Sequence, residues 1–434
     1  MDNNYFNSNN KKDCNGCGVC ALKCPKKAIT MEKDQEGFLY PQIDKSKCVN
    51  CGLCKKICPN VYYKNKNNLS KAYISYNKNS EDKKRSASGG MFYVIAKQII
   101  SMNGVVFGVT FDENLVAKHD YAQTLEDAKK FQDSKYVRSD LNDSYLKVEE
   151  FLKNDRYVLF SGTPCQCQGL RTFLKKDYAK LYTCEIICHA NPSPLVLYLY
   201  LRNLESRYGK KIKNISFRSK ENGWHNQTPI IEFEDGLVIE ENSYHEAFIQ
   251  ELINRPSCYD CRFCTTNRHS DFTIGDMWGI DKIDSSIKDD DTGLSLFVVN
   301  TEKGDEFLSK IQENLFLKET NLERAFSYNH HCNVSQHKKR DEFFKKISIK
   351  QINEDNIIKY MNKYTSRPLY KRILGKVKSV IKKLIKWLYG YSCFLLTKNF
   401  WLAIKEKKNM LNYFLLILNM KKVMKFKFKN YAII

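Results

Sequence analysis

Two short stretches decide how the chain begins: CNGCGVCALKCP at residues 14–25 and CVNCGLCKKICP at residues 48–59. Each has the spacing C-x2-C-x2-C-x3-C, followed directly by proline. Three closely spaced thiolates from one loop can reach three irons of a cubane cluster, and the fourth cysteine of such a run reaches the other cluster. Gly16, Gly18 and Gly52 leave room for the backbone to approach the sulfurs. The two runs therefore predict two 4Fe–4S clusters.

The same spacing divides the eight cysteines between the two clusters. One predicted ligand set is Cys14, Cys17, Cys20 and Cys58, and the other is Cys48, Cys51, Cys54 and Cys24. A pair of structural zinc sites also uses C-x2-C steps, but it does not explain a third step and a following proline in both runs. The pattern resembles bacterial two-cluster ferredoxins, which relay single electrons. We therefore expect another part of the chain to use those electrons.

The positive charge of the chain is concentrated at its C-terminal end. The net charge is +22, and residues 367–434 hold 17 Lys and Arg against the single acid Glu406. The first 366 residues have a net charge of only +6, which argues against a nucleic-acid-binding body. The start, Met1-Asp2-Asn3-Asn4, has no basic-then-apolar segment, so we expect no secretory signal and a cytoplasmic chain. Cysteines in such a chain are more often metal ligands or catalytic groups than disulfides.

Short apolar stretches alternate with helical ones after a polar linker at residues 63–70. Strands are expected at 72–76, 105–110 and 157–161, with an apolar helix at 91–102. This alternation is typical of a layered α/β domain. We therefore divide the chain into a ferredoxin-type domain at 1–67, an α/β body at 68–350 and a helical tail at 351–434.

Two turns of the body carry chemistry. Ser88-Gly89-Gly90 precedes a helix, whose N-terminus can hold a phosphate, although the turn taken alone favours an ordinary N-cap with flexible glycines. The second turn, Gly162 to Gln166, follows a strand, and α/β folds place ligands at the carboxyl ends of strands. Cys165 within this turn is either an exposed nucleophile or a metal ligand.

The body contains more cysteines than packing alone explains. They are Cys165, Cys167, Cys184, Cys188, Cys258, Cys261 and Cys264, followed by the isolated Cys332. Three of them form a C-x2-C-x2-C run at residues 258–264. Single buried cysteines are common, but a cluster site accounts better for so many.

Seven motifs, in this order along residues 70–280, resemble the beta subunit of coenzyme F-420 hydrogenase/dehydrogenase. This is a family of iron–sulfur flavoproteins that also includes plant 7-hydroxymethyl chlorophyll a reductase. The motifs are SGG at 88–90, SKYVRS at 134–139, GTPCQ at 162–166, Cys188-His189 with PSP at 192–194, FR at 217–218 with GW at 223–224, CYDC at 258–261, and GD at 275–276 with Trp278. A ferredoxin domain in front is usual for many bacterial members.

The resemblance implies a third 4Fe–4S cluster and a non-covalent FAD. The implied cluster ligands are Cys165, Cys188, Cys258 and Cys261; Cys264 departs from the usual pattern and could replace one of the four. The implied flavin-binding residues are Ser88, Gly89 and Gly90 at a phosphate, Lys135 and Ser139 at ribityl or ring atoms, and Gly162 and Thr163 near the ring. Lys135 would stabilise the reduced flavin, unless it is a solvated surface charge. His189, Asp276 and Trp278 could equally be structural.

The implied activity is that of an oxidoreductase in which clusters and FAD pass electrons to or from a two-electron acceptor. The family's known acceptors include a deazaflavin and a tetrapyrrole, and similar bacterial proteins are encoded with capsule and exopolysaccharide enzymes, which adds a glycan-linked substrate. A different class of function is a non-catalytic subunit that feeds electrons to a partner oxidoreductase. In either case we expect a redox partner protein.

The tail has the pattern of a basic amphipathic helix at residues 371–389. Ile373, Leu374 and Val377 begin its apolar face, and Lys376, Lys382, Lys383 and Lys386 flank that face. Such helices lie on anionic membrane surfaces, which predicts a peripheral place on the inner face of the membrane. A helix packed on the body or on a partner fits the pattern as well. A continuous apolar face makes nucleic acid the less suitable partner.

Overall fold

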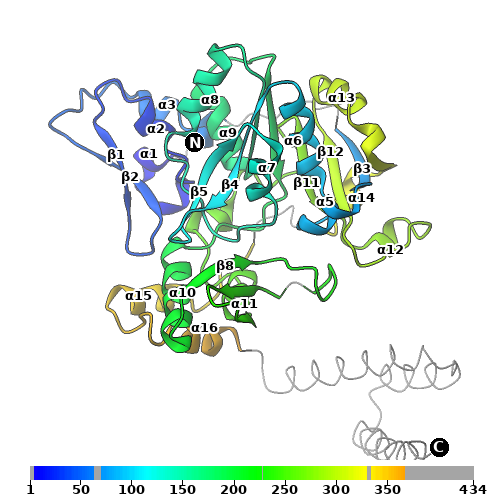
Figure 1. Cartoon of the computed structure of the whole chain (residues 1–434). Helices are drawn as coiled ribbons and strands as arrows, with labels where there is room; N and C mark the ends of the chain where they lie inside the picture. The colour runs from blue at the N-terminus through cyan, green and yellow to red at the C-terminus, as the bar shows by residue number, and fades with distance from the viewer. Residues whose placement is uncertain (1–3, 63–69, 227, 330–333, 367–434) are drawn as a thin grey trace, which may run out of the picture. The chain divides into compact units, whose positions relative to one another are not determined.

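We describe the protein from a computed structural model, in which residues 4–62, 70–226, 228–329 and 334–366 are described. Residues 1–365 form one compact unit. The predicted amphipathic helix, Cys332 and Cys393 lie outside the described residues. Figure 1 shows the chain from the N-terminal module in blue to the last described helix in orange.

The N-terminal module, residues 4–62, holds both cysteine runs in short elements. They are α1 (Tyr5–Ser8), η1 (Lys11–Asp13), α2 (Val19–Leu22), β1 (Ile29–Lys33), β2 (Leu39–Ile43), α3 (Leu53–Lys56) and α4 (Pro59–Tyr62). Strands β1 and β2 form an antiparallel hairpin that pairs Ile29 with Ile43. Gly18 and Gly52 adopt positive φ angles of 75° and 69° at the starts of α2 and α3, a conformation in which glycine is not strained.

An eight-stranded sheet in the order β13-β3-β12-β11-β7-β6-β4-β5 forms the centre of the body. The strands are β3 (Lys71–Asn77), β4 (Val105–Phe111), β5 (Ala117–Ala122), β6 (Val158–Gly162), β7 (Leu181–Ile186), β11 (Phe272–Asp276), β12 (Ser295–Val299) and β13 (Leu315–Thr320). The four adjacent strands β11, β7, β6 and β4 run parallel, with Phe160 of β6 paired to Thr183 of β7. Their carboxyl ends therefore meet at one edge of the sheet, where such folds bind ligands.

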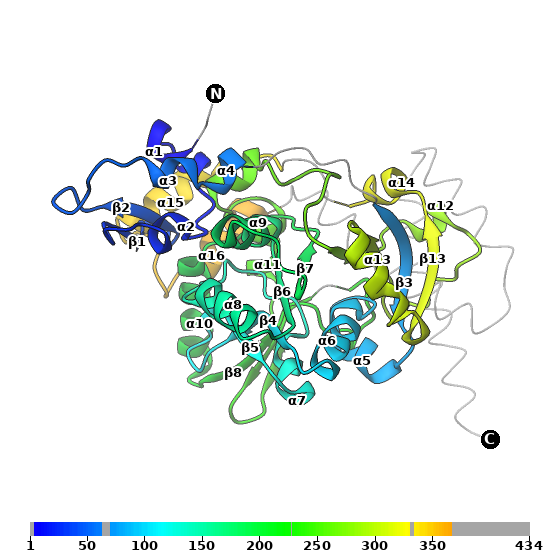
Figure 2. The same cartoon turned by 90° about the horizontal axis from the view of Figure 1, so that it is seen from above.

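Helices cover both faces of this sheet, because alternate strand residues are apolar on each side. Leu159 of β6 packs with α6 (Met91–Ser101) and α13 (Glu302–Ser309). Its neighbour Phe160 packs with α8 (Ser144–Lys153) and α9 (Pro164–Leu174). Figure 2 shows these two helix pairs on opposite sides of the sheet. The expected layered α/β architecture is therefore confirmed.

Shorter helices complete the sheet domain, and a second lobe lies below it in Figure 1. The short helices are α5 (Ser80–Arg85), α7 (Leu125–Ala128), η2 (Lys129–Phe131), η3 (Pro256–Asp260), α12 (Ile280–Ile283), η4 (Gln312–Asn314) and α14 (Leu322–Phe326). The lobe contains α10 (Pro194–Tyr208), β8 (Ile212–Ser216), β9 (Ile230–Phe233), β10 (Val238–Glu240), α11 (Ser243–Ile249), α15 (Arg340–Ser348) and α16 (Ile357–Thr365). Its three strands form an antiparallel sheet.

The sequence located the main elements of the body well. The strands expected at 72–76, 105–110 and 157–161 and the helix expected at 91–102 are confirmed as β3, β4, β6 and α6. Buried Ile352, Ile357 and Met361 pack into the lobe, so the compact unit continues past the domain end expected at residue 350. Among the described residues, no helix combines the length and the apolar character that crossing a membrane requires.

Candidate functional site

The eight cysteines of the N-terminal module surround two cavities. The inner cavity is lined by Cys14, Cys17, Cys20 and Cys58, and the outer cavity by Cys24, Cys48, Cys51 and Cys54. Each set combines three cysteines of one run with the last cysteine of the other, as the spacing predicted. Among the described residues, no three His, Cys, Asp or Glu side chains are close enough to hold a single metal ion. A cubane holds its ligands around four irons, and thiols that surround a cavity fit that arrangement.

Burial favours the neutral form of two thiols of the inner cavity, Cys17 and Cys58, because it raises their pKa values. Burial, and next the thiol of Cys58, raises the pKa of Cys17 to about 12. Burial likewise raises the pKa of Cys58 to about 11. Four adjacent thiolates become stable only when bound cationic metal compensates their charge. The donor set therefore fits a metal cluster.

A third cavity in the body is lined by five cysteines, Cys165, Cys188, Cys258, Cys261 and Cys264. Cys165 is the second residue of α9, Cys188 follows β7, and the other three lie in or just after η3. The structure thus brings together all four body cysteines of the predicted set and adds Cys264. Cys167 and Cys184 are instead buried in the core on the two faces of the sheet.

Polar groups surround the sulfurs of this body cysteine cavity. The backbone N–H of Asn191 donates to Sγ of Cys258 at 3.3 Å. The Arg138 guanidinium donates to Sγ of Cys165 at 3.5 Å, and the Thr163 hydroxyl lies 3.2 Å from the same sulfur. Hydrogen bonds to sulfur tune the reduction potential of an iron–sulfur cluster. Arg138 belongs to the SKYVRS motif, but the sequence did not indicate that Arg138 and Asn191 bond to the cysteine sulfurs.

Arginines of the body attach the N-terminal module next to this cavity. Arg138 donates to the carbonyl oxygen of Gly16 at 3.2 Å with its second nitrogen. Arg255 donates to the carbonyl oxygen of Cys14 at 2.9 Å, and α2 and α4 pack against α9. Asn15 lines both the inner cavity and the body cysteine cavity. The inner cavity therefore faces the body.

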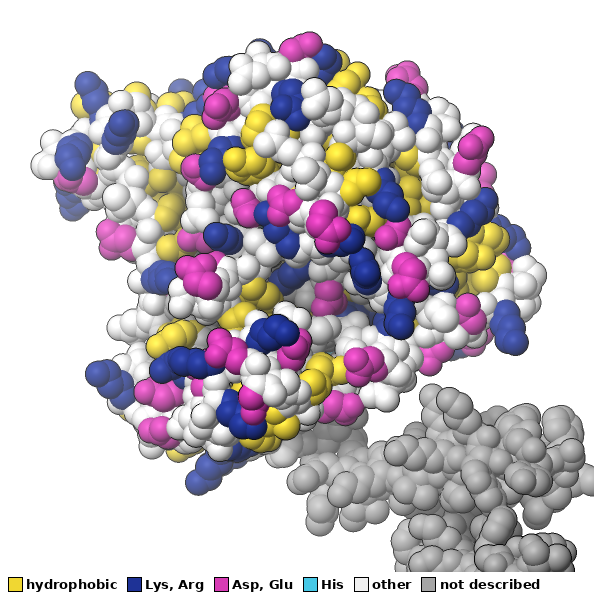
Figure 3. Space-filling model, viewed as in Figure 1, with side chains coloured by type: hydrophobic (Ala, Val, Ile, Leu, Met, Phe, Trp, Pro, Cys, Tyr) yellow, Lys and Arg dark blue, Asp and Glu magenta, His cyan; other side chains and the backbone are white. Residues whose placement is uncertain are grey.

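A large cavity of about 570 Å³ opens beside the body cysteines. Its wall includes the carboxyl ends of β6, β7 and β11 and the N-terminus of α6. The residues that line both this cavity and the body cysteine cavity are Thr163, Cys188, His189, Ala190 and Asn191. Figure 3 shows the surface hollowed between the sheet domain and the lobe. The sequence expected a ligand at this edge of the sheet, and the cavity is there.

Most of the predicted flavin residues line this cavity. They are Ser88, Gly90, Lys135, Ser139, Gly162 and Thr163. Gly89 is not part of the wall, because its N–H donates to the Ser295 hydroxyl at 2.9 Å and its carbonyl accepts the Asn77 N–H. The Ser139 hydroxyl is already engaged with His119 and Gln166.

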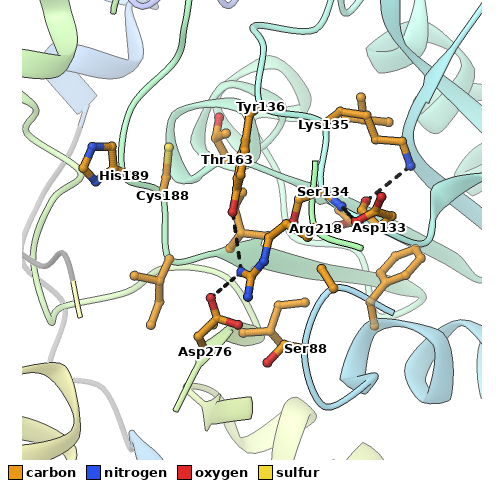
Figure 4. Close-up of a pocket in the computed structure, with 18 of the residues that line it drawn as sticks. Ser88, Asp133, Ser134, Lys135, Tyr136, Thr163, Cys188, His189, Arg218 and Asp276 are labelled. Carbon is orange, nitrogen blue, oxygen red and sulfur yellow. Dashed lines mark hydrogen bonds and ion pairs between the residues drawn. The ribbon is translucent and has the colours of Figure 1, made fainter. Parts of the chain in front are cut away.

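Lys135 has surroundings that neither sequence alternative described. Its ammonium donates to the carbonyl oxygens of Lys130, Gln132 and Asp133 at 3.0, 2.6 and 3.3 Å. Burial lowers its pKa to about 8. In Figure 4 the amine points toward its own loop, away from Arg218. The role of Lys135 visible in the structure is to hold the loop that forms one wall of the cavity.

An ion pair in the cavity wall joins Arg218 and Asp276, with Nη1 2.5 Å from Oδ2. Figure 4 shows this pair beneath the Tyr136 hydroxyl, and the guanidinium also lies over the Trp278 ring. Nη2 of Arg218 and Oδ1 of Asp276 are buried and have no hydrogen-bond partner. Both residues belong to motifs of the resemblance, but the sequence did not indicate that they meet.

Comparison with known proteins agrees with this arrangement. Residues 155–325 match the family that describes the C-terminal part of the coenzyme F420 hydrogenase/dehydrogenase beta subunit. Residues 13–61 match a 4Fe-4S dicluster domain, and residues 43–88 match a 4Fe-4S single cluster domain of Ferredoxin I. No curated protein matches the chain.

A chain of the F420-reducing [NiFe] hydrogenase complex from Methanosarcina barkeri, solved as a xenon derivative, is 17% identical with a TM-score of 0.39. The match covers 67% of this chain and 90% of that chain. The family matches agree in making this an iron–sulfur electron-transfer protein of the oxidoreductase type. Residues 155–325 thus match the C-terminal domain of the coenzyme F420 hydrogenase/dehydrogenase beta subunit, and they follow an N-terminal 4Fe-4S dicluster domain.

Proposed function

We propose that the chain is an iron–sulfur flavoprotein oxidoreductase that exchanges electrons with a two-electron acceptor, either a deazaflavin-like compound or a glycan-linked substrate. One observation carries the proposal: from the outer cavity at the surface to the large cavity, each cavity shares a wall residue with the next. Phe6 lines the outer and inner cavities, Asn15 the inner and body cysteine cavities, and Cys188 the body cysteine and large cavities. Such contiguity is what electron transfer between cofactors needs.

The cysteine sets assign the residues that would hold three clusters. Four thiolates per set match the ligand requirement of a 4Fe–4S cluster, and the body cavity offers one thiol more than it needs. We assign Cys165, Cys188, Cys258 and Cys261 as its ligands. Asn191 would donate its N–H to the Cys258 sulfur, which favours the reduced state of a bound cluster.

The large cavity would hold FAD, which supplies conversion between one-electron and two-electron chemistry. The unpartnered Nη2 of Arg218 and Oδ1 of Asp276 offer one donor and one acceptor, as the pyrimidine edge of the flavin ring requires. Ser88, Gly90 and the N-terminus of α6 would face a phosphate, because backbone N–H groups at a helix N-terminus attract anions. Lys220 adds positive charge there, since it donates to the Ser88 carbonyl oxygen at 2.5 Å.

Anaerobic iron, sulfide and flavin quantitation, combined with a redox titration, tests the proposal. We expect about twelve irons per chain and one flavin. The Cys261→Ala variant should lose about four irons, whereas Cys264→Ala should keep the wild-type iron content. Full iron content without any flavin binding would leave only an electron-relay subunit, and equal iron loss in the two variants would overturn the ligand assignment.

A further inference from the structure

Among the cysteine-lined cavities of the described residues, the outer cavity is the one that contains an exposed cysteine. Of the fifteen described cysteines, Cys51 alone is exposed. All residues that line the outer cavity belong to the N-terminal module, whereas the inner cavity faces the arginines of the body. An electron that enters or leaves the module through protein contact would therefore pass the surface around Cys51.

Lysines dominate this surface. We define the lysine patch as six exposed residues, Lys26, Lys27, Lys45, Lys47, Lys55 and Lys56. Lys26 and Lys55 line the outer cavity directly. Asp44 is the acid among them, and it pairs with Lys47 at 3.0 Å. Dark blue side chains mark the outer edge of the module at the upper left of Figure 3. The patch therefore has a strong excess of positive charge.

Apolar side chains lie inside the lysine patch, beside the exposed thiol. Val49 is 58% exposed and Ile43 is 39% exposed, and both line the outer cavity. Transient interfaces commonly place apolar contacts at the centre and charged residues at the rim. Rim charges of one sign increase the association rate of a partner with the opposite charge.

We infer that the lysine patch is the docking surface for a small acidic one-electron carrier protein, such as a ferredoxin-type carrier. This inference rests on the proposed electron path. In each encounter the carrier would be oxidised by one electron, and the cluster that Cys24, Cys48, Cys51 and Cys54 would hold would be reduced by one. No bond or proton changes place, so the surface needs only to bring the two redox groups together.

Stopped-flow reduction of the full-length, cluster-loaded chain by a reduced acidic 2[4Fe–4S] ferredoxin tests the inference. The Lys26→Glu/Lys55→Glu variant should be reduced about tenfold more slowly than wild type at low salt. Added salt should slow the wild type toward the variant, because counterions screen surface charges. The methyl viologen radical cation should reduce the variant at least as fast as wild type, since negative charge does not repel a cation.

The matched control is Lys288→Glu/Lys310→Glu, which makes the same charge change at exposed positions near α12 and α13, far from the module in Figure 1. This control should keep the wild-type rate with ferredoxin. Equal slowing in both variants, or a reduction rate that does not depend on salt, would overturn the inference. It would also be overturned if the Lys26→Glu/Lys55→Glu variant lost binding to anionic vesicles while its reduction by ferredoxin stayed unchanged. Absence of clusters in the wild type would instead contradict the proposed function, so the two failures are distinguishable.

Discussion

The inner and outer cavities of the N-terminal module are built from the same motif but have different surroundings. Body arginines bond to the carbonyl oxygens of Cys14 and Gly16 beside the inner cavity. The outer cavity contacts solvent and lysines. Cluster potential depends on charge, hydrogen bonding and exposure. Two sites with equal ligand sets can therefore serve as entry point and internal relay.

The largest expected difference between the two cavities concerns stability. Cys17→Ala and Cys51→Ala should each lose about four irons. Metal binding is coupled to folding, and the loop at Cys17 also carries the contacts to Arg138 and Arg255. We therefore expect Cys17→Ala to lower the melting temperature by several degrees, whereas Cys51→Ala should leave the unfolding of the body nearly unchanged. Calorimetry together with iron analysis measures both, and equal melting temperatures would show that the module does not stabilise the body.

Local patterns explain why the sequence predicted the cysteine sets of the two cavities but not the contacts that surround them. The cysteine sets follow from spacing within twelve residues, and β3, β4, β6 and α6 follow from short apolar periods. Arg138, Arg255 and the module approach one another only after folding, so no local pattern indicates their contact. Lys135 shows the same limit, because its carbonyl partners depend on the loop conformation and not on residue type.

A smaller effect is expected at Gly169, where α9 packs against the module. A Cβ atom there would lie 2.5 Å from the Tyr145 hydroxyl and 3.1 Å from Cβ of Cys17. Helix propensity alone would make Gly169→Ala stabilising by about 1 kcal/mol. Overpacking costs about 1–3 kcal/mol, so we expect net destabilisation in denaturant unfolding.

The Tyr145→Phe background controls for the overlap at Gly169. Removing the hydroxyl relieves the closest contact, so Gly169→Ala should cost less in this background than in wild type. The double-mutant cycle isolates this coupling. A stabilised single variant would mean that Tyr145 and Cys17 do not pack closely against Gly169.

The smallest expected effect is a change in the midpoint potential of a cluster next to Arg138, beside the inner cavity. Arg138 joins the inner cavity loop to Cys165, with 3.2 Å to the Gly16 oxygen and 3.5 Å to the sulfur. Its positive charge favours the reduced state of a nearby cluster. Arg138→Gln should therefore lower the midpoint potential of the proposed body cluster by on the order of 50 mV, measured by EPR-monitored titration.

The outer cluster provides the internal reference for Arg138, since this side chain bonds to Gly16 and Cys165 and is not part of the outer cavity wall. Its potential should stay unchanged in Arg138→Gln. Arg138→Lys keeps the charge but not the forked geometry, so it should restore the potential without restoring both hydrogen bonds. Equal shifts at the outer and body clusters would contradict the view that the body arginines distinguish the two cavities of the module.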